Sequence, residues 1–189
     1  MPVNVPNLLT WFRILMIPVV VGLFYLPDGW LSSWERNLMA CVVFTAAAIT
    51  DWLDGYLARR LNQMSAFGAF LDPVADKLMV AAALIVLVEL ARVHPLIAVI
   101  IIGREIAISA LREWMAKIGD TKSVAVNVLG KIKTIAQMVA IPMLLYNDRI
   151  LFFDPHIVGS LLIYMAALLT LISMVYYMKL AAPNAARHG

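Results

Sequence analysis

Four aspartates lie close together in an otherwise apolar part of the chain, between residues 51 and 76. Asp51 and Asp54 are three residues apart, and Asp72 and Asp76 are four residues apart, so each pair projects from one face of a helix. An aspartate at the centre of a membrane helix costs roughly 2.5–3.5 kcal/mol on insertion scales, and four such residues without partners would be hard to sustain. We therefore expect the four carboxylates to share a ligand.

Divalent metal ions are the ligand that suits four converging carboxylates. The short polar stretch 58–68 predicts that the two helices are antiparallel neighbours, which would place both pairs at similar depth. Carboxylates at close range repel one another unless cations neutralise them, and an all-oxygen cluster suits Mg²⁺ or Mn²⁺. Zinc would favour His or Cys, which this stretch lacks. The pattern predicts a site for two metal ions, an arrangement that clamps the oxygens of an in-line phosphoryl displacement.

Two glycines and an arginine accompany the aspartates. Gly55 and Gly68 lie one in each expected helix. Small residues permit close packing of membrane helices, but beside carboxylates they also allow a ligand to approach the backbone. Arg59 follows Gly55 by about one turn and can donate charge-assisted hydrogen bonds to a pyrophosphate.

The remainder of the chain must position this site within a membrane. Of the 189 residues, 63% are apolar and 14% are charged, whereas soluble domains have roughly 45–50% and 25%. The single cysteine, Cys41, excludes an intrachain disulfide. Six apolar runs are long enough and continuous enough for helices: 8–26, 38–57, 67–90, 95–115, 132–146 and 157–178. We predict one all-α domain, residues 1–189, with six transmembrane helices.

The distribution of basic residues predicts the orientation of these spans. An even number of spans places both termini on one side, together with eight basic residues: Arg59, Arg60, Lys117, Lys122, Lys131, Lys133, Lys179 and Arg187. The opposite loops hold three arginines against five acids. The positive-inside rule therefore places the termini and the aspartates on the cytoplasmic side. Arg13, at the start of the first span, either reaches the lipid phosphates or contributes to a polar site.

The spacing Asp51-x-x-Asp54-Gly55-x-x-Ala58-Arg59, then eight residues, then Gly68-x-x-x-Asp72-x-x-x-Asp76, resembles the complete signature of the CDP-alcohol phosphotransferase family. The resemblance implies a six-helix membrane fold, commonly a homodimer, in which an alcohol attacks a cytidine diphosphate-linked donor and CMP is released. It also implies roles for individual residues. The metal ligands would be Asp51, Asp54, Asp72 and Asp76, with Asp76 also the general base, and the CDP pocket would comprise Gly55, Ala58, Arg59 and Gly68, with Asn7 and Thr10 as weaker candidates.

Segments outside the signature, from NLLTWFRILMIPV to GKIKTIAQMVA, are similar to members of this family whose acceptor is sn-glycerol 3-phosphate. The similarity implies transfer of the phosphatidyl group from CDP-diacylglycerol to that acceptor, giving phosphatidylglycerophosphate and CMP at the inner membrane of a bacterium. The expected partners are the two substrates, membrane lipids and a second copy of the chain, and no nucleic acid.

The phosphate of such an acceptor requires cations from other spans. We predict an acceptor pocket from the polar residues of the fourth and fifth runs: Arg104, Arg112, Lys131, Lys133 and Thr134. An arginine inside a membrane span is a functional-site hypothesis by default. The alternative is that Arg104 neutralises Glu105 or Glu113, and that the two lysines follow the positive-inside rule.

Other functions would produce some of the same features. Serine, inositol phosphate or a cardiolipin precursor could replace glycerol 3-phosphate as the acceptor with the same signature. A cation transporter would place its acids near the middle of the membrane, in broken helices or repeated halves. The aspartates here lie near one end of their spans, and the sequence contains no visible repeat. A purely structural membrane protein would retain its function after all four were changed to asparagine.

Overall fold

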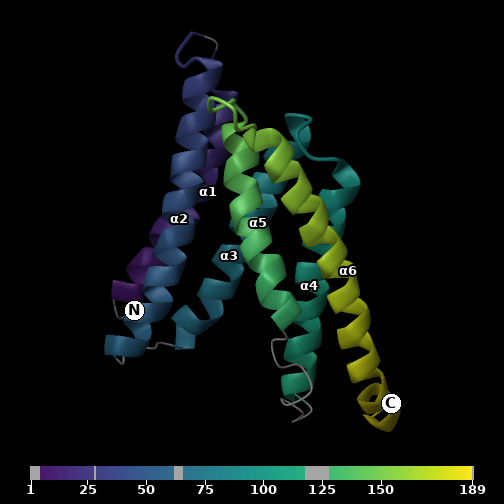
Figure 1. Cartoon of the computed structure of the whole chain (residues 1–189). Helices are drawn as coiled ribbons and strands as arrows, with labels where there is room; N and C mark the ends of the chain where they lie inside the picture. The colour runs from purple at the N-terminus through teal and green to yellow at the C-terminus, as the bar shows by residue number, and fades with distance from the viewer. Residues whose placement is uncertain (1–4, 28, 62–65, 118–127, 189) are drawn as a thin grey trace.

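The computed structural model is an all-helical bundle, and it describes residues 5–27, 29–61, 66–117 and 128–188 (Figure 1). In chain order the elements are α1 (Val5–Gly22), the short 3₁₀ helix η1 (Leu23–Tyr25), α2 (Ser33–Leu61), α3 (Ala66–Glu89), α4 (Pro95–Lys117), α5 (Val128–Tyr146) and α6 (Pro155–His188). The described residues form no β-sheet, only one isolated bridge between Ile150 and Phe153. Each of the six apolar runs corresponds to a helix, which confirms the all-α prediction.

The helix starts follow from local sequence. Pro95 and Pro155 are the first residues of α4 and α6, a position where the missing N–H costs nothing. A capping box precedes α2. The backbone N–H of Ser32 donates to Oε2 of Glu35 at 2.7 Å, and the backbone N–H of Glu35 donates to Oγ of Ser32 at 3.3 Å. These contacts fix where α2 begins.

The helices pack in a particular order. Helix α1 packs against both α2 and α3, α5 packs against α2 and α6, and α4 packs against α3 and α6. The prediction that α2 and α3 are direct neighbours was wrong, since they share little packing within the described residues. Helix α1 lies against both of them instead, and its buried polar residues Thr10 and Arg13 contact both aspartate-bearing helices.

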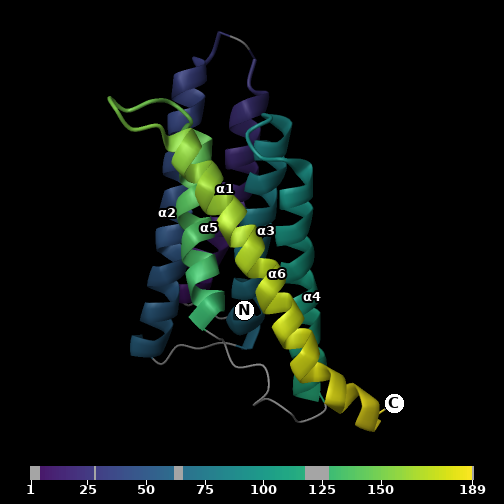
Figure 2. The ribbon, with the colours of Figure 1, turned by 45° about the vertical axis from the view of Figure 1, so that its right-hand side comes forward.

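The apolar core closes one end of the bundle. It includes Leu23, Phe44, Leu87 and Leu144, which come from four different elements and are almost fully buried. Towards the other end, α2 diverges from α5 and α6 (Figure 1). The beginning of α1 and the end of α6 both lie at this open end (Figures 1 and 2). The aspartate-bearing ends of α2 and α3 lie there too.

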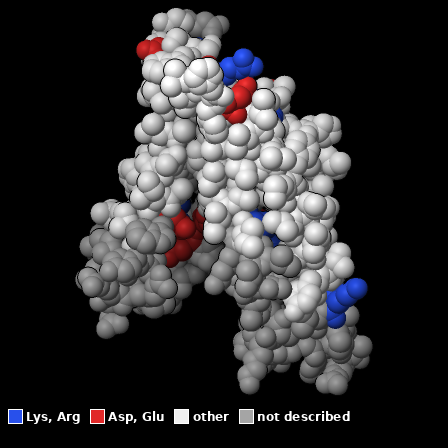
Figure 3. All heavy atoms as spheres, viewed as in Figure 1, with Lys and Arg blue, Asp and Glu red and all other residues white. Residues whose placement is uncertain are grey.

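The outer surface is apolar over much of its height. Large side chains such as Ile85, Val99, Ile135 and Leu168 are each at least 60% exposed. Figure 3 shows few charged atoms on the middle of one face, outside its central hollow. By length and composition, Leu8–Tyr25 and Pro155–Lys179 could each cross a membrane, and Ile132–Tyr146 is a shorter apolar helix. A surface of this kind is expected to contact lipid or another protein.

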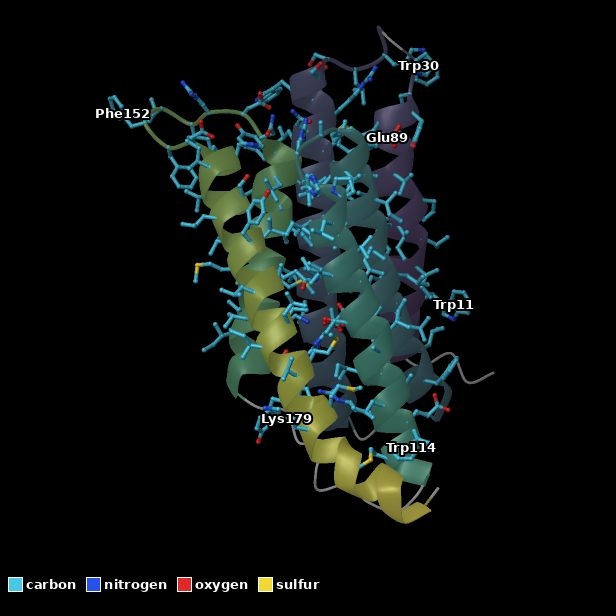
Figure 4. All side chains as sticks on the ribbon, turned by 90° about the vertical axis from the view of Figure 1, so that its right-hand side faces the viewer. Trp11, Trp30, Glu89, Trp114, Phe152 and Lys179 are labelled. Carbon is cyan, nitrogen blue, oxygen red and sulfur yellow. The ribbon has the colours of Figure 1, made fainter. Side chains whose placement is uncertain are left out.

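Aromatic residues lie at both ends of the bundle. Figure 4 shows Trp30, Glu89 and Phe152 at the closed end of the bundle, and Trp114 and Lys179 at the open end. Trp30 and Trp34 are 73% and 51% exposed, and tryptophans in such positions are typical of the aromatic belt at a membrane interface.

Candidate active site

Two polar residues of α1 contact the aspartates of α2 and α3. The Nη1 of Arg13 lies 2.6 Å from Oδ1 of Asp51, and the Oγ1 of Thr10 donates a hydrogen bond to Oδ1 of Asp72. Arg13 is 1% exposed and Thr10 is fully buried. Of the two interpretations of Arg13, the structure therefore favours the polar site. Thr10, predicted for the CDP pocket, lies at the edge of the carboxylate group.

Asp51 lines a cavity of about 350 Å³ between α2 and α5. The cavity wall is otherwise mostly apolar, with Thr45, Ala48 and Ile49 on α2 and Thr134, Met138 and Pro142 on α5. Figure 3 shows acidic atoms at the bottom of the hollow between the two sides of the bundle. Asp51 interacts electrostatically with Asp72 and with Asp76.

Asp76 lies in a second, smaller pocket of about 50 Å³. Its lining comes from three helices and comprises Asp76, Lys77, Val80, Glu105, Thr134, Gln137 and Met138. Thr134 lines both this pocket and the larger cavity, so the two adjoin at α5. A ligand in the smaller pocket would meet carboxylate, hydroxyl, amide and ammonium groups within a few ångströms.

Two buried cations meet at Glu105. The Nζ of Lys133 donates to Oε1 of Glu105, and the Nη1 of Arg104 lies 3.5 Å from the same oxygen. Lys133 is 1% exposed and Arg104 is 7% exposed. The pairing of Arg104 with Glu105, weighed above as an alternative to a functional role, is present. The two cations share this one carboxylate, although Asp76 lines the same pocket as Glu105. The Nε of Arg104 has no hydrogen-bond partner in the described part of the chain, so a donor remains for an anion.

Helix α6 holds Arg104 from the other side. The Nη2 of Arg104 donates to Oγ of Ser173 at 3.2 Å, and the guanidinium carbon lies 5.9 Å from the ring centroid of Tyr177. Ser173 donates in turn to the backbone oxygen of Thr170 at 2.9 Å. Both Ser173 and Tyr177 are buried, so they fix the guanidinium by a hydrogen bond and a cation–π contact.

The other predicted site residues have different positions. Arg112 is exposed, and no contact places it with Arg104 among the described residues. Gly68 is buried in the first turn of α3, four residues before Asp72. Six of the predictions concern side chains or positions outside the described part of the structure: Asn7, Asp54, Gly55, Ala58, Arg59 and Lys131.

Comparison with known proteins then tests the resemblance seen in the aspartate signature. Residues 3–175 match the family model for CDP-alcohol phosphatidyltransferases. The chain belongs to that family. This membership confirms the identification made from the signature.

Individual members of the CDP-alcohol phosphatidyltransferase family match almost end to end. Proteins from Salmonella choleraesuis (strain SC-B67), Shigella flexneri serotype 5b (strain 8401) and Escherichia coli (strain K12) are each 49% identical over 185 residues, which is 96% of this chain and 96% of theirs. All three are named CDP-diacylglycerol–glycerol-3-phosphate 3-phosphatidyltransferase.

The carboxylates of the candidate site are suitable ligands for a hard divalent cation. Asp51, Asp72 and Asp76 offer only carboxylate oxygens, as Mg²⁺ and Mn²⁺ prefer. Within the described part of the chain, no three His, Cys, Asp or Glu side chains are grouped closely enough to hold an ion. Asp54, the fourth expected ligand, is outside that part. The two-metal site therefore stays a prediction.

Sequence reasoning missed four residues that the fold brings to the site. Glu105 was considered only as a counter-ion, and Gln137, Ser173 and Tyr177 were not considered at all. Gln137 follows Lys133 by four residues, so helical spacing on α5 could have indicated it. Ser173 and Tyr177 are also four apart, but only the packing of α6 on α4 shows which arginine they meet.

Proposed function

We propose that this protein transfers the phosphatidyl group of CDP-diacylglycerol to sn-glycerol 3-phosphate, giving phosphatidylglycerophosphate and CMP. The observation that carries the proposal is the 49% identity, over 96% of both chains, to proteins named for this reaction. The geometry supports it, because an aspartate pocket and a buried pair of cations adjoin at Glu105.

Asp76 is the proposed general base. It accepts the proton of the acceptor's primary hydroxyl, whose oxygen attacks the phosphorus that carries the diacylglycerol. The bond from that phosphorus to the bridging pyrophosphate oxygen breaks, CMP departs with the bridging oxygen, and the proton passes from Asp76 to solvent. No covalent enzyme intermediate is required, since positioning and charge stabilisation supply most of the catalysis in phosphoryl transfer.

Arg104 and Lys133 are proposed to bind the acceptor phosphate. Both are buried and both contact Glu105, so they are held in place before the acceptor arrives. A phosphate monoester carries up to two negative charges, and it competes with the single charge of Glu105 for these donors. Arg112, Lys131 and Thr134 remain proposed members of the wider pocket.

The donor is proposed to lie across the open ends of α2 and α3. Asp51, Asp54, Asp72 and Asp76 would hold two Mg²⁺ or Mn²⁺ ions, which when bound neutralise charge on the pyrophosphate. The proposed nucleotide pocket consists of Gly55, Ala58, Arg59 and Gly68, with Asn7 and Thr10 nearby in the sequence of α1. The cavity between α2 and α5, whose lining includes Thr45 and Pro142, is apolar enough to accommodate the glycerol backbone and the start of the lipid tails.

The proposed setting is the inner membrane of a bacterium, with all six helices spanning it as one domain. The exposed apolar side chains and the aromatic residues at both ends of the bundle support this arrangement. The excess of basic residues in the segments predicted to share one side of the membrane with the termini supports a cytoplasmic position for the site and both termini. A homodimer is proposed from the family resemblance.

A direct test measures CMP release by the purified protein in detergent. CDP-diacylglycerol and Mg²⁺ are supplied with glycerol 3-phosphate, serine or inositol phosphate in parallel. We expect release only with glycerol 3-phosphate and its loss on addition of a chelator, with recovery when Mg²⁺ or Mn²⁺ is restored. Faster release with another acceptor would refute the proposed acceptor, and full activity in chelator would refute the metal requirement.

A further inference from the structure

Gln137 is a buried polar residue that the proposed reaction leaves without a role. It lies on α5, and its side chain is 4% exposed. Its side-chain carbonyl oxygen, Oε1, has no hydrogen-bond partner in the described part of the chain. A buried oxygen in that state has lost its water without compensation, which is costly to folding. A bound ligand that carries a hydrogen-bond donor would satisfy this oxygen.

The position of Gln137 indicates which ligand this is. Gln137 lines the pocket of about 50 Å³ that also contains Asp76, Thr134 and Glu105. Lys133 precedes it by one helical turn and contacts Glu105. The amide therefore belongs to the same small pocket as the proposed base and the counter-ion of the proposed phosphate-binding cations.

The acceptor carries three polar groups, and the site offers a counterpart for each: the proposed base, the proposed phosphate-binding cations and the Gln137 amide. In sn-glycerol 3-phosphate the primary hydroxyl would meet Asp76 and the phosphate would meet Arg104 and Lys133. The secondary hydroxyl, on the carbon between them, then needs a hydrogen-bond acceptor. We propose that Gln137 recognises the acceptor by accepting a hydrogen bond from this secondary hydroxyl at Oε1.

This inference rests on the proposed function and makes Gln137 a specificity-determining residue. A site built to bond a hydroxyl rejects an analogue lacking it much more strongly than an apolar pocket does, because the protein group is left unpaired. Gln137 would also limit rotation of the acceptor about its carbon chain. The primary hydroxyl would then be held facing Asp76, so the contact would affect turnover as well as binding.

The experiment compares two acceptors that differ only in this hydroxyl. 3-Hydroxypropyl phosphate retains the primary hydroxyl and the phosphate of sn-glycerol 3-phosphate but lacks the secondary hydroxyl. We expect the unmodified protein to prefer glycerol 3-phosphate by about ten- to a hundredfold in kcat/KM. In Gln137→Met the preference should fall to within about threefold of unity, mainly through slower reaction of glycerol 3-phosphate. Gln137→Glu keeps an acceptor oxygen and should retain the preference.

Thr170→Val provides a matched control. Thr170 is also fully buried in a helix, but it does not line the pocket. We expect this variant to keep the preference of the unmodified protein, and thermal unfolding would verify that all variants are folded. An equal loss with both acceptors in Gln137→Met would indicate a structural role and overturn the inference. So would an unmodified protein that does not distinguish the two acceptors, whereas failure to use glycerol 3-phosphate at all would refute the proposed function instead.

Discussion

The three described aspartates of the signature have different neighbours, and these neighbours determine what each substitution should do. Asp51 is paired with Arg13, and Asp72 accepts a hydrogen bond from Thr10. Asp76 instead lines a small polar pocket beside Gln137 and Glu105. At the scale of single residues, the pocket position of Asp76 therefore supports its proposed role as the base, and the other two aspartates lie towards α1.

Changing Asp76 to asparagine should slow the chemical step more than it weakens donor binding. A general base acts in the transition state, and its loss typically costs about 10²–10⁴-fold in rate. The measurement is a single-turnover rate at saturating CDP-diacylglycerol, together with the donor affinity. Asp148→Asn, at the closed end, is the control and should retain the full rate. A normal single-turnover rate in Asp76→Asn would remove this residue from the role of base.

Changing Arg104 or Lys133 to alanine should raise the KM for glycerol 3-phosphate and leave donor binding nearly intact. A charge-assisted contact to a phosphate contributes about 1.5–3 kcal/mol, which corresponds to roughly ten- to a hundredfold in affinity. Arg104→Lys should recover only part of the loss, because lysine lacks the planar two-pronged donor. Initial rates against acceptor concentration at saturating donor measure the effect. Unchanged acceptor curves in both variants would move the phosphate site, with Arg112 and Lys131 the next residues to test.

At the scale of elements, α1 and α6 act as braces for the site. Neither carries an aspartate of the signature, yet α1 contacts Asp51 and Asp72, and α6 contacts Arg104. The bundle order makes this possible, because α1 packs on both α2 and α3 while α6 packs on both α4 and α5. The open end of the bundle is thus held by side-chain contacts from two flanking helices.

Changing Arg13 to methionine should destabilise the open end. The pair joins a buried guanidinium to a carboxylate that is 38% exposed, so its loss lies between the values for surface and buried pairs, at about 1–3 kcal/mol. The readout is the thermal unfolding midpoint in detergent. Arg149→Met is the matched control, because Arg149 is 79% exposed and its pair with Asp154 should contribute little. Equal midpoints for the two variants would contradict the bracing role of α1.

Changing Tyr177 to leucine should raise the acceptor KM by about two- to thirtyfold, because a cation–π contact is worth about 0.5–2 kcal/mol and its loss frees the guanidinium of Arg104. Tyr177→Phe keeps the aromatic face and should recover most of the affinity. Tyr176→Leu, at the exposed neighbouring position, serves as the control. If kcat fell while the acceptor KM stayed constant in Tyr177→Leu, the residue would not act through Arg104.

At the scale of the whole molecule, the bundle has a closed end with the apolar core and an open end with the candidate site. Arg92, in the loop between α3 and α4, joins α2 and α5 at the closed end. Its Nη1 donates to the backbone oxygens of Leu144 and Leu145 at 3.1 and 2.7 Å, and its Nη2 donates to Oδ1 of Asn37 at 2.8 Å. Asn37 donates in turn to Asp148. This network satisfies the carbonyls at the end of α5 and ties them to α2.

Changing Arg92 to methionine should therefore lower stability without changing acceptor preference. Hydrogen bonds to charged groups contribute about 1.5–3 kcal/mol, so the unfolding midpoint should fall measurably. The ratio of rates with glycerol 3-phosphate and 3-hydroxypropyl phosphate should stay as in the unmodified protein. The unfolding midpoint and the acceptor ratio of Arg92→Met are compared with those of Arg36→Met. Arg36 lies at the same end and donates to the backbone oxygen of Pro27 at 3.2 Å. A changed acceptor ratio in Arg92→Met would show that the two ends are coupled.

The sequence alone determined the helical class, the six apolar runs and the family, because these depend on local composition and on residues at fixed spacing along one or two helices. Asp51, Asp72 and Asp76 could be selected in this way. Their direct partners could not. Nothing in the spacing of the aspartates along α2 and α3 shows that α1 contacts both helices. The role of Arg13 was therefore left open, and the direct packing of α2 against α3 was predicted incorrectly.

The tertiary structure decided which distant side chains share a pocket. Arg104 and Lys133 are 29 positions apart, and they meet at Glu105 because α4 and α5 bring them to the same depth. Ser173 contacts Arg104 from α6, whose sequence is mostly apolar, and Gln137 lines the same pocket as Glu105 from α5. Helical periodicity fixes the face on which a residue lies, but the partner of that face depends on helix packing, which is set by the summed burial of many side chains.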